Sequence, residues 1–371
     1  MNTRPVLDSD KGPFALSASL NADNSCFSVA LESGFRVFSC KTGDQKIARE
    51  LGGGLGQAEM LGTTRYVALI GGGRAPKFPQ NKVHIFNDAT QAVSTSLELA
   101  APIHRIKISQ THLIVVLLHS VRIYRMALPP ALLATYETTA NAHGLCALGS
   151  SIVAFPGRAV GQVKIYDLGT GNVSIIPAST SPLRALALSS DDAQLATASE
   201  AGTLVRLWSF PACTKTGEVR RGVDAAVILG VAFSPSGTAV AVTSDKGTLH
   251  IFDLPSGGRA SHETRASEST PTDHKWRMLS KLPLLPRQFS DTYSNCSTPF
   301  SLGDDYTSLD TGLVPGVPGG RPTKGLLGWL DESSVVCIGA GQDARWEKFV
   351  VGYDDMGKRA VWREGWRRYL D

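Results

Sequence analysis

The sequence lacks a long apolar run, a strong net charge and an apolar leader. The longest wholly aliphatic segment runs only from Leu113 to Leu118, whereas a membrane-spanning helix needs roughly 20 apolar residues. The 37 Lys and Arg residues against 33 Asp and Glu leave a net charge of +4, which is too small to indicate nucleic-acid binding. No apolar segment follows the first basic residue, so we expect no secretory signal. Any contact with a membrane would therefore be peripheral.

Motifs for metal binding and catalysis are also lacking. The six cysteines lie far apart without a Cys-x-x-Cys spacing, which argues against a zinc cluster and a disulfide framework and favours a reducing compartment. No pair of histidines at metal-ligand spacing has a third ligand beside it, and no Gly-x-Ser-x-Gly motif occurs. The glycine runs Gly52–Gly54 and Gly71–Gly73 lack the lysine of a phosphate loop, so we expect turns there. We expect no metal, no cofactor and no catalytic residues.

A repeated pattern dominates what the sequence does contain. Hydrophobic residues make up 42% of a chain with 37 Gly and 20 Pro, a composition typical of a folded protein with many turns. Short segments alternate apolar and polar residues and end in an aromatic side chain, at Phe38, Phe86, Tyr124, Tyr166, Trp208 and Phe252. These positions are 48, 38, 42, 42 and 44 residues apart, which is the period of a four-stranded propeller blade.

The repeat also locates a long insertion. Each aromatic segment is interpreted as the closing strand of a unit, because it follows an earlier apolar run and a turn. The next comparable strand after Phe252 is centred on Phe349, 97 residues later, which leaves roughly 54 residues beyond one blade of about 43. The sequence therefore predicts an all-β, WD40-like, seven-bladed β-propeller over residues 10–371. A long and flexible loop, residues 255–323, is expected in blade six.

Two adjacent arginines, Arg220 and Arg221, lie between the fifth and sixth units. Neighbouring side chains of a strand leave on opposite faces, so each arginine can serve a different pocket. A guanidinium presents a planar fork of donors that matches phosphate oxygens. The neighbouring units supply hydroxyl and basic side chains, at Ser199, Thr203 and Arg206 and at Ser244, Thr248 and His250. From these residues alone, a solvated arginine pair on an edge strand remains the alternative.

Several segments carry a resemblance to a known family. They are Asn24–Phe38, Tyr66–Gly73, Pro76–Val83, Gly144–Cys146, Ala154–Gly157, Ala196–Glu200 and Arg220–Gly222. In these segments the chain resembles the PROPPIN family of propellers, and especially its fungal branch homologous to swollen-vacuole proteins. The resemblance covers about residues 20–255. It implies binding of phosphatidylinositol 3-phosphate and phosphatidylinositol 3,5-bisphosphate, with roles in autophagy, nucleophagy and vacuolar traffic.

The resemblance also implies two phosphoinositide sites on the rim of the propeller. The first would contain Ser199, Thr203, Arg206 and Arg220, and the second would contain Arg221, Ser244, Thr248 and His250. One departure concerns the first site, since relatives often carry a histidine shortly before the inner strand of blade five. This chain has none in Pro177–Ser181, so its first site is expected to be weaker or differently tuned.

The resemblance further places a membrane-inserting loop in blade six. Residues Lys275–Phe289 mix cations with large apolar side chains, a composition typical of segments in the lipid interface. The expected membrane-contacting residues are Trp276, Met278, Leu279, Leu282, Leu284 and Leu285. The alternative is that this segment folds back on the propeller as an additional strand or a lid.

Partners and location follow from the same resemblance. It implies recruitment of a large lipid-transfer protein of autophagy, and a cytoplasmic protein peripherally associated with vacuole, endosome and pre-autophagosomal membranes. We expect no enzyme activity, no nucleic-acid partner and no transmembrane segment. The rival hypothesis is a purely protein-binding WD40 scaffold in which Arg220 and Arg221 contact acidic side chains. The duplicated hydroxyl groups favour phosphate over a peptide.

Overall fold

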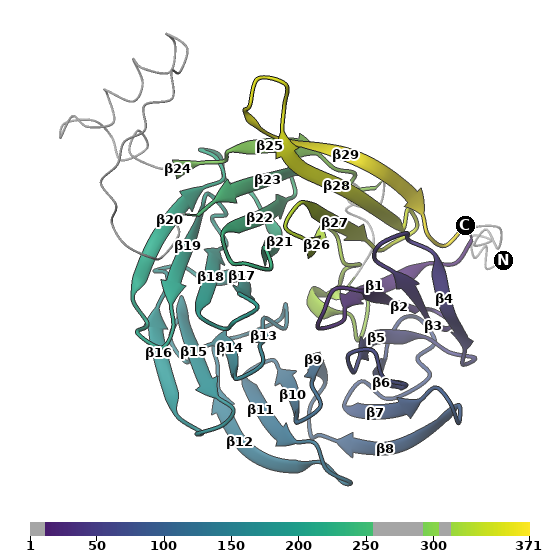
Figure 1. Cartoon of the computed structure of the whole chain (residues 1–371). Helices are drawn as coiled ribbons and strands as arrows, with labels where there is room; N and C mark the ends of the chain where they lie inside the picture. Colours follow the sequence, from purple (N-terminus) through teal and green to yellow (C-terminus); the bar gives the residue numbers. More distant parts are fainter. Residues whose placement is uncertain (1–11, 255–291, 304–312) are drawn as a thin grey trace, which may run out of the picture.

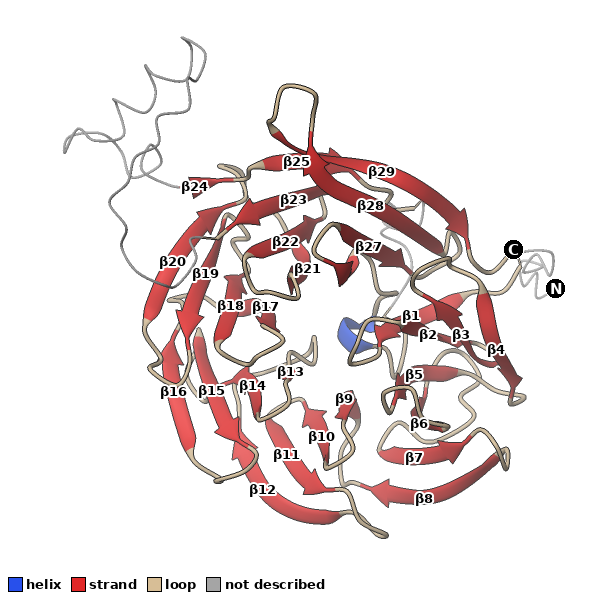
Figure 2. Ribbon diagram, viewed as in Figure 1, coloured by secondary structure: helices blue, strands red, loops and turns tan. Residues whose placement is uncertain are grey.

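The computed structural model describes residues 12–254, 292–303 and 313–371. In these residues seven β-sheets stand around a central axis and form a ring, with each sheet as one blade (Figure 1). Almost all of the regular structure is strand, and the short 3-10 helix η3 (Pro318–Gly320) lies near the centre of the ring (Figure 2). The predicted all-β, seven-bladed propeller is confirmed.

The first four blades are built from consecutive strands. Blade one contains β1 (Ala15–Leu20), β2 (Cys26–Leu31), β3 (Gly34–Ser39) and β4 (Gln45–Glu50). Blade two contains β5 (Leu55–Met60), β6 (Tyr66–Gly71), β7 (Lys82–Asn87) and β8 (Ala92–Glu98). Blade three contains β9 (Ile103–Ile108), β10 (His112–Leu117), β11 (Ser120–Arg125) and β12 (Ala131–Glu137). Blade four contains β13 (Ala147–Leu148), β14 (Ile152–Pro156), β15 (Gln162–Asp167) and β16 (Val173–Pro177).

The last three blades include one additional edge strand. Blade five contains β17 (Leu183–Leu188), β18 (Gln194–Ser199), β19 (Leu204–Ser209) and β20 (Lys215–Arg220), with β24 (Thr292–Tyr293) added at its edge. Blade six contains β21 (Ile228–Phe233), β22 (Ala239–Ser244), β23 (Thr248–Asp253) and β25 (Cys296–Pro299). Blade seven contains β26 (Leu326–Asp331), β27 (Ser334–Gly339), β28 (Arg345–Tyr353) and β29 (Arg359–Arg368).

The aromatic segments of the repeat are the third strands of the blades. Phe38 lies on β3 and Phe349 on β28, and each third strand is followed by a fourth strand at the outer edge. The interpretation of these segments as closing strands was therefore wrong by one strand. The physical reason is exposure, because β8 and β12 are largely solvent-exposed and carry little apolar patterning. The second strands are the opposite case, and β2, β10, β22 and β27 are buried along their whole length.

The hydrophobic core lies in the seams between neighbouring blades. In the seam between blades five and six, Val205 and Val219 pack against Val242 and Phe252. Burying each large apolar side chain in such a seam contributes roughly 1.5–3 kcal/mol to folding. The alternating pattern of the third strands follows from this arrangement, since their apolar side chains enter the seams.

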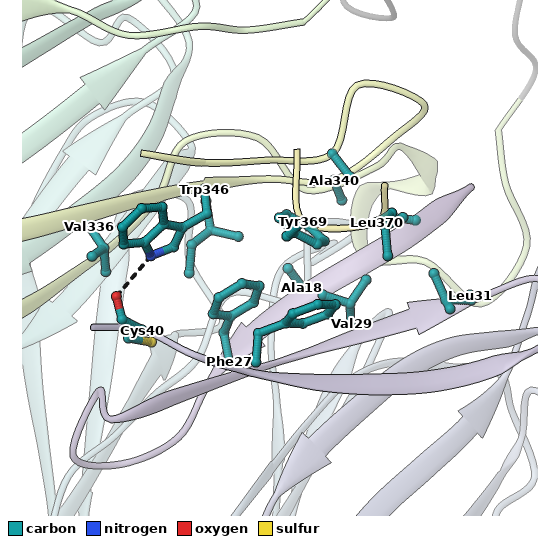
Figure 3. Close-up of a cluster of buried hydrophobic side chains, with 14 residues drawn as sticks. Ala18, Phe27, Val29, Leu31, Cys40, Val336, Ala340, Trp346, Tyr369 and Leu370 are labelled. Atoms are coloured by element: carbon teal, nitrogen blue, oxygen red, sulfur yellow. Dashed lines mark hydrogen bonds between the residues drawn. The ribbon is translucent and has the colours of Figure 1, made fainter. Parts of the chain in front are cut away.

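The ring is closed by side chains between blades one and seven (Figure 3). Trp346 of β28 packs in a cluster with Phe27, Phe38 and Tyr369, and its indole Nε1 donates to the carbonyl oxygen of Cys40 at 2.8 Å. The ring centroids of Phe27 and Phe38 are 5.1 Å apart, and those of Phe38 and Tyr369 are 4.9 Å apart. Neither blade borrows a strand from the other. An isolated antiparallel bridge between Ala15 and Gly341 accompanies this side-chain packing at the closure.

The segments that follow β23 belong to different blades of the propeller. The residues of β25 form the fourth strand of blade six, and β24 pairs in parallel with β20 of blade five. Residues 292–303 and 313–323, which the sequence analysis included in one loop of 255–323, therefore contribute to the propeller. Within the described part of the chain, the insertion in blade six separates β23 from β24. Residues 255–291 and 304–312 lie outside the described residues.

Residues 313–323 connect blade six to blade seven and contact blade two on the way. The amide of Gly73 donates to the carbonyl oxygen of Pro315 at 3.0 Å. A Cβ atom on Gly56 would lie only 2.3 Å from the carbonyl oxygen of Gly316, so the two backbones can meet only without side chains. The glycine run Gly71–Gly73 was expected as a turn, but Gly71 is the last residue of β6. The run lies against this connection.

Candidate functional site

The two adjacent arginines face two different seams of the propeller. Val219 of β20 packs into the cluster shared with blade six, so Glu218 and Arg220 on either side of it face blade four. Arg221, one residue further along the extended chain, faces blade six. Both arginines are largely buried, with 9% of each residue exposed. Each seam therefore contains one guanidinium close to the rim.

Blade six presents three polar side chains to the seam that contains Arg221. His250 of β23 is the register partner of Val242, which packs against blade five. Ser244 and Thr248 each lie two residues further along their strands, on the same face as Val242 and His250. The structure thus brings Arg221, Ser244, Thr248 and His250 to one seam.

Arg221 is held by neutral acceptors. Its Nε donates to the carbonyl oxygen of Gly202 at 3.0 Å, and its Nη2 donates to the carbonyl oxygen of Asp224. Burial lowers the pKa of Arg221 below its usual value, and the charges of Asp245 and Asp224 oppose this only in part. A buried cation without a directly bonded carboxylate is stabilised by an incoming anion, because the anion replaces the lost hydration.

His250 is neutral in this setting. Burial, together with the positive charge of Arg221, lowers the pKa of His250 to about 4. Its Nδ1 lies 3.2 Å from the hydroxyl oxygen of Ser294. A neutral imidazole has one N–H donor, so the ring can hydrogen-bond an acceptor without adding a second charge beside Arg221. A bound anion would counteract the charge effect of Arg221 and raise the pKa of His250.

The seam between blades four and five holds most of the first predicted site. Trp208 and Leu195 pack into the cluster shared with blade four. Arg206 and Ser199 lie on the same faces of β19 and β18 as these two residues. Arg220 is the register partner of Leu204 and shares this side of the sheet. Ser199, Arg206 and Arg220 therefore come together in one seam.

A carboxylate lies within this first set. The Nε of Arg206 is 3.1 Å from Oε2 of Glu218, and Nζ of Lys215 is 2.6 Å from the same oxygen. The Glu218 side chain is only 12% exposed. Glu218 thus orients Arg206 and offsets part of its positive charge. Sequence reasoning missed this role, although the spacing of two between Glu218 and Arg220 already placed both on one face.

Thr203 is placed differently from its predicted counterpart Thr248. Thr248 is the first residue of β23, whereas Thr203 precedes β19, whose first residue is Leu204. The amide of Arg221 donates to the carbonyl oxygen of Thr203 at 2.9 Å. The register therefore sets Thr203 opposite Arg221 and not opposite Arg220. The sequence held the signal, because Thr203 precedes Arg206 by three residues while Thr248 precedes His250 by two.

Two further residues, on or next to strand β24, lie beside the two predicted phosphoinositide sites. Tyr293 of β24 pairs in parallel with Arg220, and the next residue, Ser294, contacts His250. The segment β24 is too short for periodicity to reveal it. The insertion of blade six thus returns to the propeller directly beside the two arginine seams.

Comparison with known proteins decides the family. A sequence model described as PROPPIN matches residues 15–311 of this chain. The chain belongs to the PROPPIN family. The resemblance identified from the sequence is confirmed. PROPPINs are known as phosphoinositide-binding β-propellers of autophagy and are a binding family rather than an enzyme family.

Relatives of this PROPPIN chain cover most of its length. SVP1-like protein 2 of Emericella nidulans is 49% identical over 313 residues, which cover 84% of this chain and 99% of the relative. The crystal structure of Kluyvelomyces marxianus Hsv2 has a TM-score of 0.74 and 20% identity, and covers 96% of this chain and 98% of that chain. A complex of KlAtg21 with the coiled-coil of AgAtg16 gives a TM-score of 0.67 and 16% identity, and covers 95% and 99%. These two structures show the propeller fold.

The remaining predictions for this PROPPIN chain concern the membrane-contacting insertion, membrane-spanning segments, metal sites and disulfides. The residues expected to contact the membrane, from Trp276 to Leu285, lie outside the described residues, so that expectation stays a prediction. No helix in the described ranges is long and apolar enough to span a bilayer. Among these residues no three His, Cys, Asp or Glu side chains are grouped to hold a metal ion. All six cysteines have free thiols.

Proposed function

We propose that this PROPPIN chain binds phosphatidylinositol 3-phosphate and phosphatidylinositol 3,5-bisphosphate through two rim sites. The main support for this proposal is that Arg220 and Arg221 face adjacent seams, and that each shares its seam with hydroxyl side chains. The first site consists of Ser199, Arg206 and Arg220, and the second of Arg221, Ser244, Thr248 and His250. Thr203 belongs to the first set by resemblance, but its register supports a place beside Arg221.

The chemistry of both sites suits a phosphate ester. Guanidinium groups form charge-assisted hydrogen bonds with phosphate oxygens, and a neutral His250 with two hydroxyl groups adds donors without competing charge. The second site is the better candidate for tight binding, because its arginine is bonded to carbonyl oxygens only. The first site must share Arg206 with Glu218.

Binding to a membrane would combine several weak contacts. Two sites on one molecule raise the effective concentration of each second contact, so avidity replaces high single-site affinity. Residues Trp276, Met278, Leu279, Leu282, Leu284 and Leu285 of the insertion would add apolar contacts in the lipid interface. Because a single weak anchor is marginal, the protein would remain in the cytoplasm until the lipid is made. It would then act at vacuole, endosome and pre-autophagosomal membranes as an effector and scaffold that recruits an autophagy lipid-transfer protein.

Liposome flotation tests this proposal. The native chain should float with vesicles that contain either 3-phosphorylated lipid, and the Arg220→Ala/Arg221→Ala variant should lose about tenfold or more of this binding. The Arg125→Ala/Arg158→Ala variant is the charge-matched control, since it removes two exposed arginines of blades three and four. It should float like the native chain once circular dichroism has shown that all proteins are folded.

Equal flotation of the native chain and the Arg220→Ala/Arg221→Ala variant would overturn the two-site proposal. The protein-binding scaffold would then be the better account, and a structural neighbour is known in complex with a coiled-coil of AgAtg16. Its signature would be capture of a protein partner that depends on the arginines but not on lipid.

A further inference from the structure

Blade seven repeats the strand register that carries Arg220 in blade five. Arg220 ends β20 and pairs with Leu204, the first residue of β19. Arg368 ends β29 and pairs with Arg345, the first residue of β28. The following amide also behaves alike, since Tyr369 donates to the carbonyl oxygen of Ala344 at 3.1 Å. Arg368 therefore occupies in blade seven the structural place of Arg220 in blade five.

Arg345 and Arg368 face blade six. Phe349 packs into the cluster shared with blade six, and Trp346 into the cluster shared with blade one. Arg345 lies on the Phe349 face of β28, and its register partner Arg368 lies on the same side of the sheet. The neighbouring Arg367 faces blade one instead and forms an ion pair with Asp44 at 2.6 Å. Two consecutive arginines thus serve two seams here, as Arg220 and Arg221 do.

A buried carboxylate fixes the two guanidinium groups. Asp343, whose side chain is 7% exposed, lies 2.7 Å from Nε of Arg345 and 2.8 Å from Nε of Arg368. The Arg345 guanidinium also lies 4.8 Å from the ring centroid of Trp366. The side chains of Arg345 and Arg368 stay 22% and 49% exposed. Their terminal Nη groups make no further hydrogen bond within the described ranges, so these donors can bind an external acceptor.

The charge of the cluster is positive. Two arginines against one carboxylate leave a net charge of +1. Burial raises the pKa of Asp343, but the hydrogen bonds and charges of Arg345 and Arg368 outweigh it and keep this pKa below its usual value. Asp343 therefore stays ionised and holds the arginines in place near neutral pH.

We propose that Arg345 and Arg368, oriented by Asp343, form a third phosphate-binding site between blades six and seven. Two guanidinium groups fixed on one carboxylate present several donors to a tetrahedral anion. The ligand class is a phosphate monoester, carried either by a lipid head group or free in solution. This site is independent of the two proposed above and extends the phosphate-binding rim by one seam.

The test uses the full chain with the first two sites disabled. In the Arg220→Ala/Arg221→Ala background, isothermal titration with soluble inositol 1,3-bisphosphate should still detect binding. Adding Arg345→Ala and Arg368→Ala should weaken this binding by about tenfold or more. The matched control is Arg367→Ala in the same background, because it removes an adjacent arginine that faces the other seam. It should change the affinity by less than about twofold.

Three results would overturn the third site. They are no binding in the Arg220→Ala/Arg221→Ala background, equal loss with Arg367→Ala, and no loss with Arg345→Ala and Arg368→Ala. The first result leaves the two-site function intact if the native chain binds the head group. If the quadruple variant is not folded by circular dichroism, Arg368→Ala alone carries the test, since its side chain is the more exposed one. Competition by inorganic phosphate would assign the site to the phosphate group itself, whereas tighter binding to vesicles with 3-phosphorylated lipid than to the soluble head group would assign it to a membrane surface.

Discussion

The seam between blades one and seven and the seam between blades five and six use the same strand faces for opposite purposes. The first buries Phe27, Phe38, Trp346 and Tyr369 in mutual contact. The second continues at the rim into buried polar groups, with Arg221 beside neutral carbonyls. Aromatic burial stabilises the ring, whereas a buried charge costs stability. Ring closure and the proposed ligand binding therefore lie in different seams of the same repeated architecture.

The largest expected effect tests the apolar seam. Trp346→Ala should lower the free energy of unfolding by about 3–5 kcal/mol, because it leaves a cavity and removes the bond to Cys40. Urea unfolding followed by circular dichroism measures this loss. Trp362→Ala is the control on the neighbouring strand, where the indole is 45% exposed, and it should cost much less. Similar losses in both variants would contradict the assignment of ring closure to the cluster around Trp346.

A smaller effect is expected from Glu218, the carboxylate that distinguishes the seam between blades four and five from the seam that contains Arg221. Glu218→Gln should strengthen binding to vesicles with 3-phosphorylated lipids by about fivefold, because it removes the charge that offsets Arg206 and Lys215. Titration with vesicles at two salt concentrations measures the change, and the gain should shrink at high salt. The control is Glu364→Gln, which breaks an ion pair with Lys348 in blade seven. Unchanged or weaker binding of Glu218→Gln would argue that Glu218 positions Arg206 and is needed as a carboxylate.

The smallest effect concerns acid stability. The pKa of His250 is lowered to about 4 in the folded protein from an ordinary value of 6.5, so the unfolded chain binds a proton more readily. Its stabilising contribution is present above the ordinary value and is lost as the pH falls toward the folded value. His250→Asn should therefore reduce the loss of stability on acidification. The pKa of His143 is also lowered to about 4, by burial and by the charges of Arg184 and Arg105. The His250→Asn variant should therefore still lose some stability as the pH falls.

Urea midpoints between about pH 7 and about pH 4.5 measure this change. The exposed His119 provides the control variant His119→Asn. An equally steep loss of stability in His250→Asn and the native chain would show that this imidazole does not sense acid.

The sequence predicted the parts of this fold that are constrained by packing on both faces. The third strands alternate because Val205 and Leu207 enter one seam while Trp208 enters the other. The positions of the fourth strands could not be predicted from the sequence. The strand β12, for example, is largely solvent-exposed and leaves even Leu132 and Leu133 exposed. A strand that faces solvent carries a weak sequence pattern. The number of blades and the four strands in each followed from the repeat period, but the positions of the fourth strands did not.

The candidate site was predictable in composition but less so in register. Arg220 and Arg221 could be assigned to opposite faces from their adjacency alone. Thr203 was grouped with Arg220 because its motif matches that of Thr248, yet one residue between Gly202 and β19 reverses its face. The blade seven cluster was not recognised, since Asp343, Arg345 and Arg368 form no motif and meet only through the pairing of β28 with β29.

The closure of the ring by side chains affects when the protein can finish folding. Six seams join blades that are consecutive in the chain, so they can form while synthesis proceeds. The seventh seam joins Cys40 to Trp346, which are 306 residues apart, and it must wait until Tyr369 and Leu370 have left the ribosome. Until then the aromatic faces of blades one and seven stay open to water and to other chains. The aromatic face of blade one is therefore the part of the incomplete ring that stays open to chaperones until blade seven has formed.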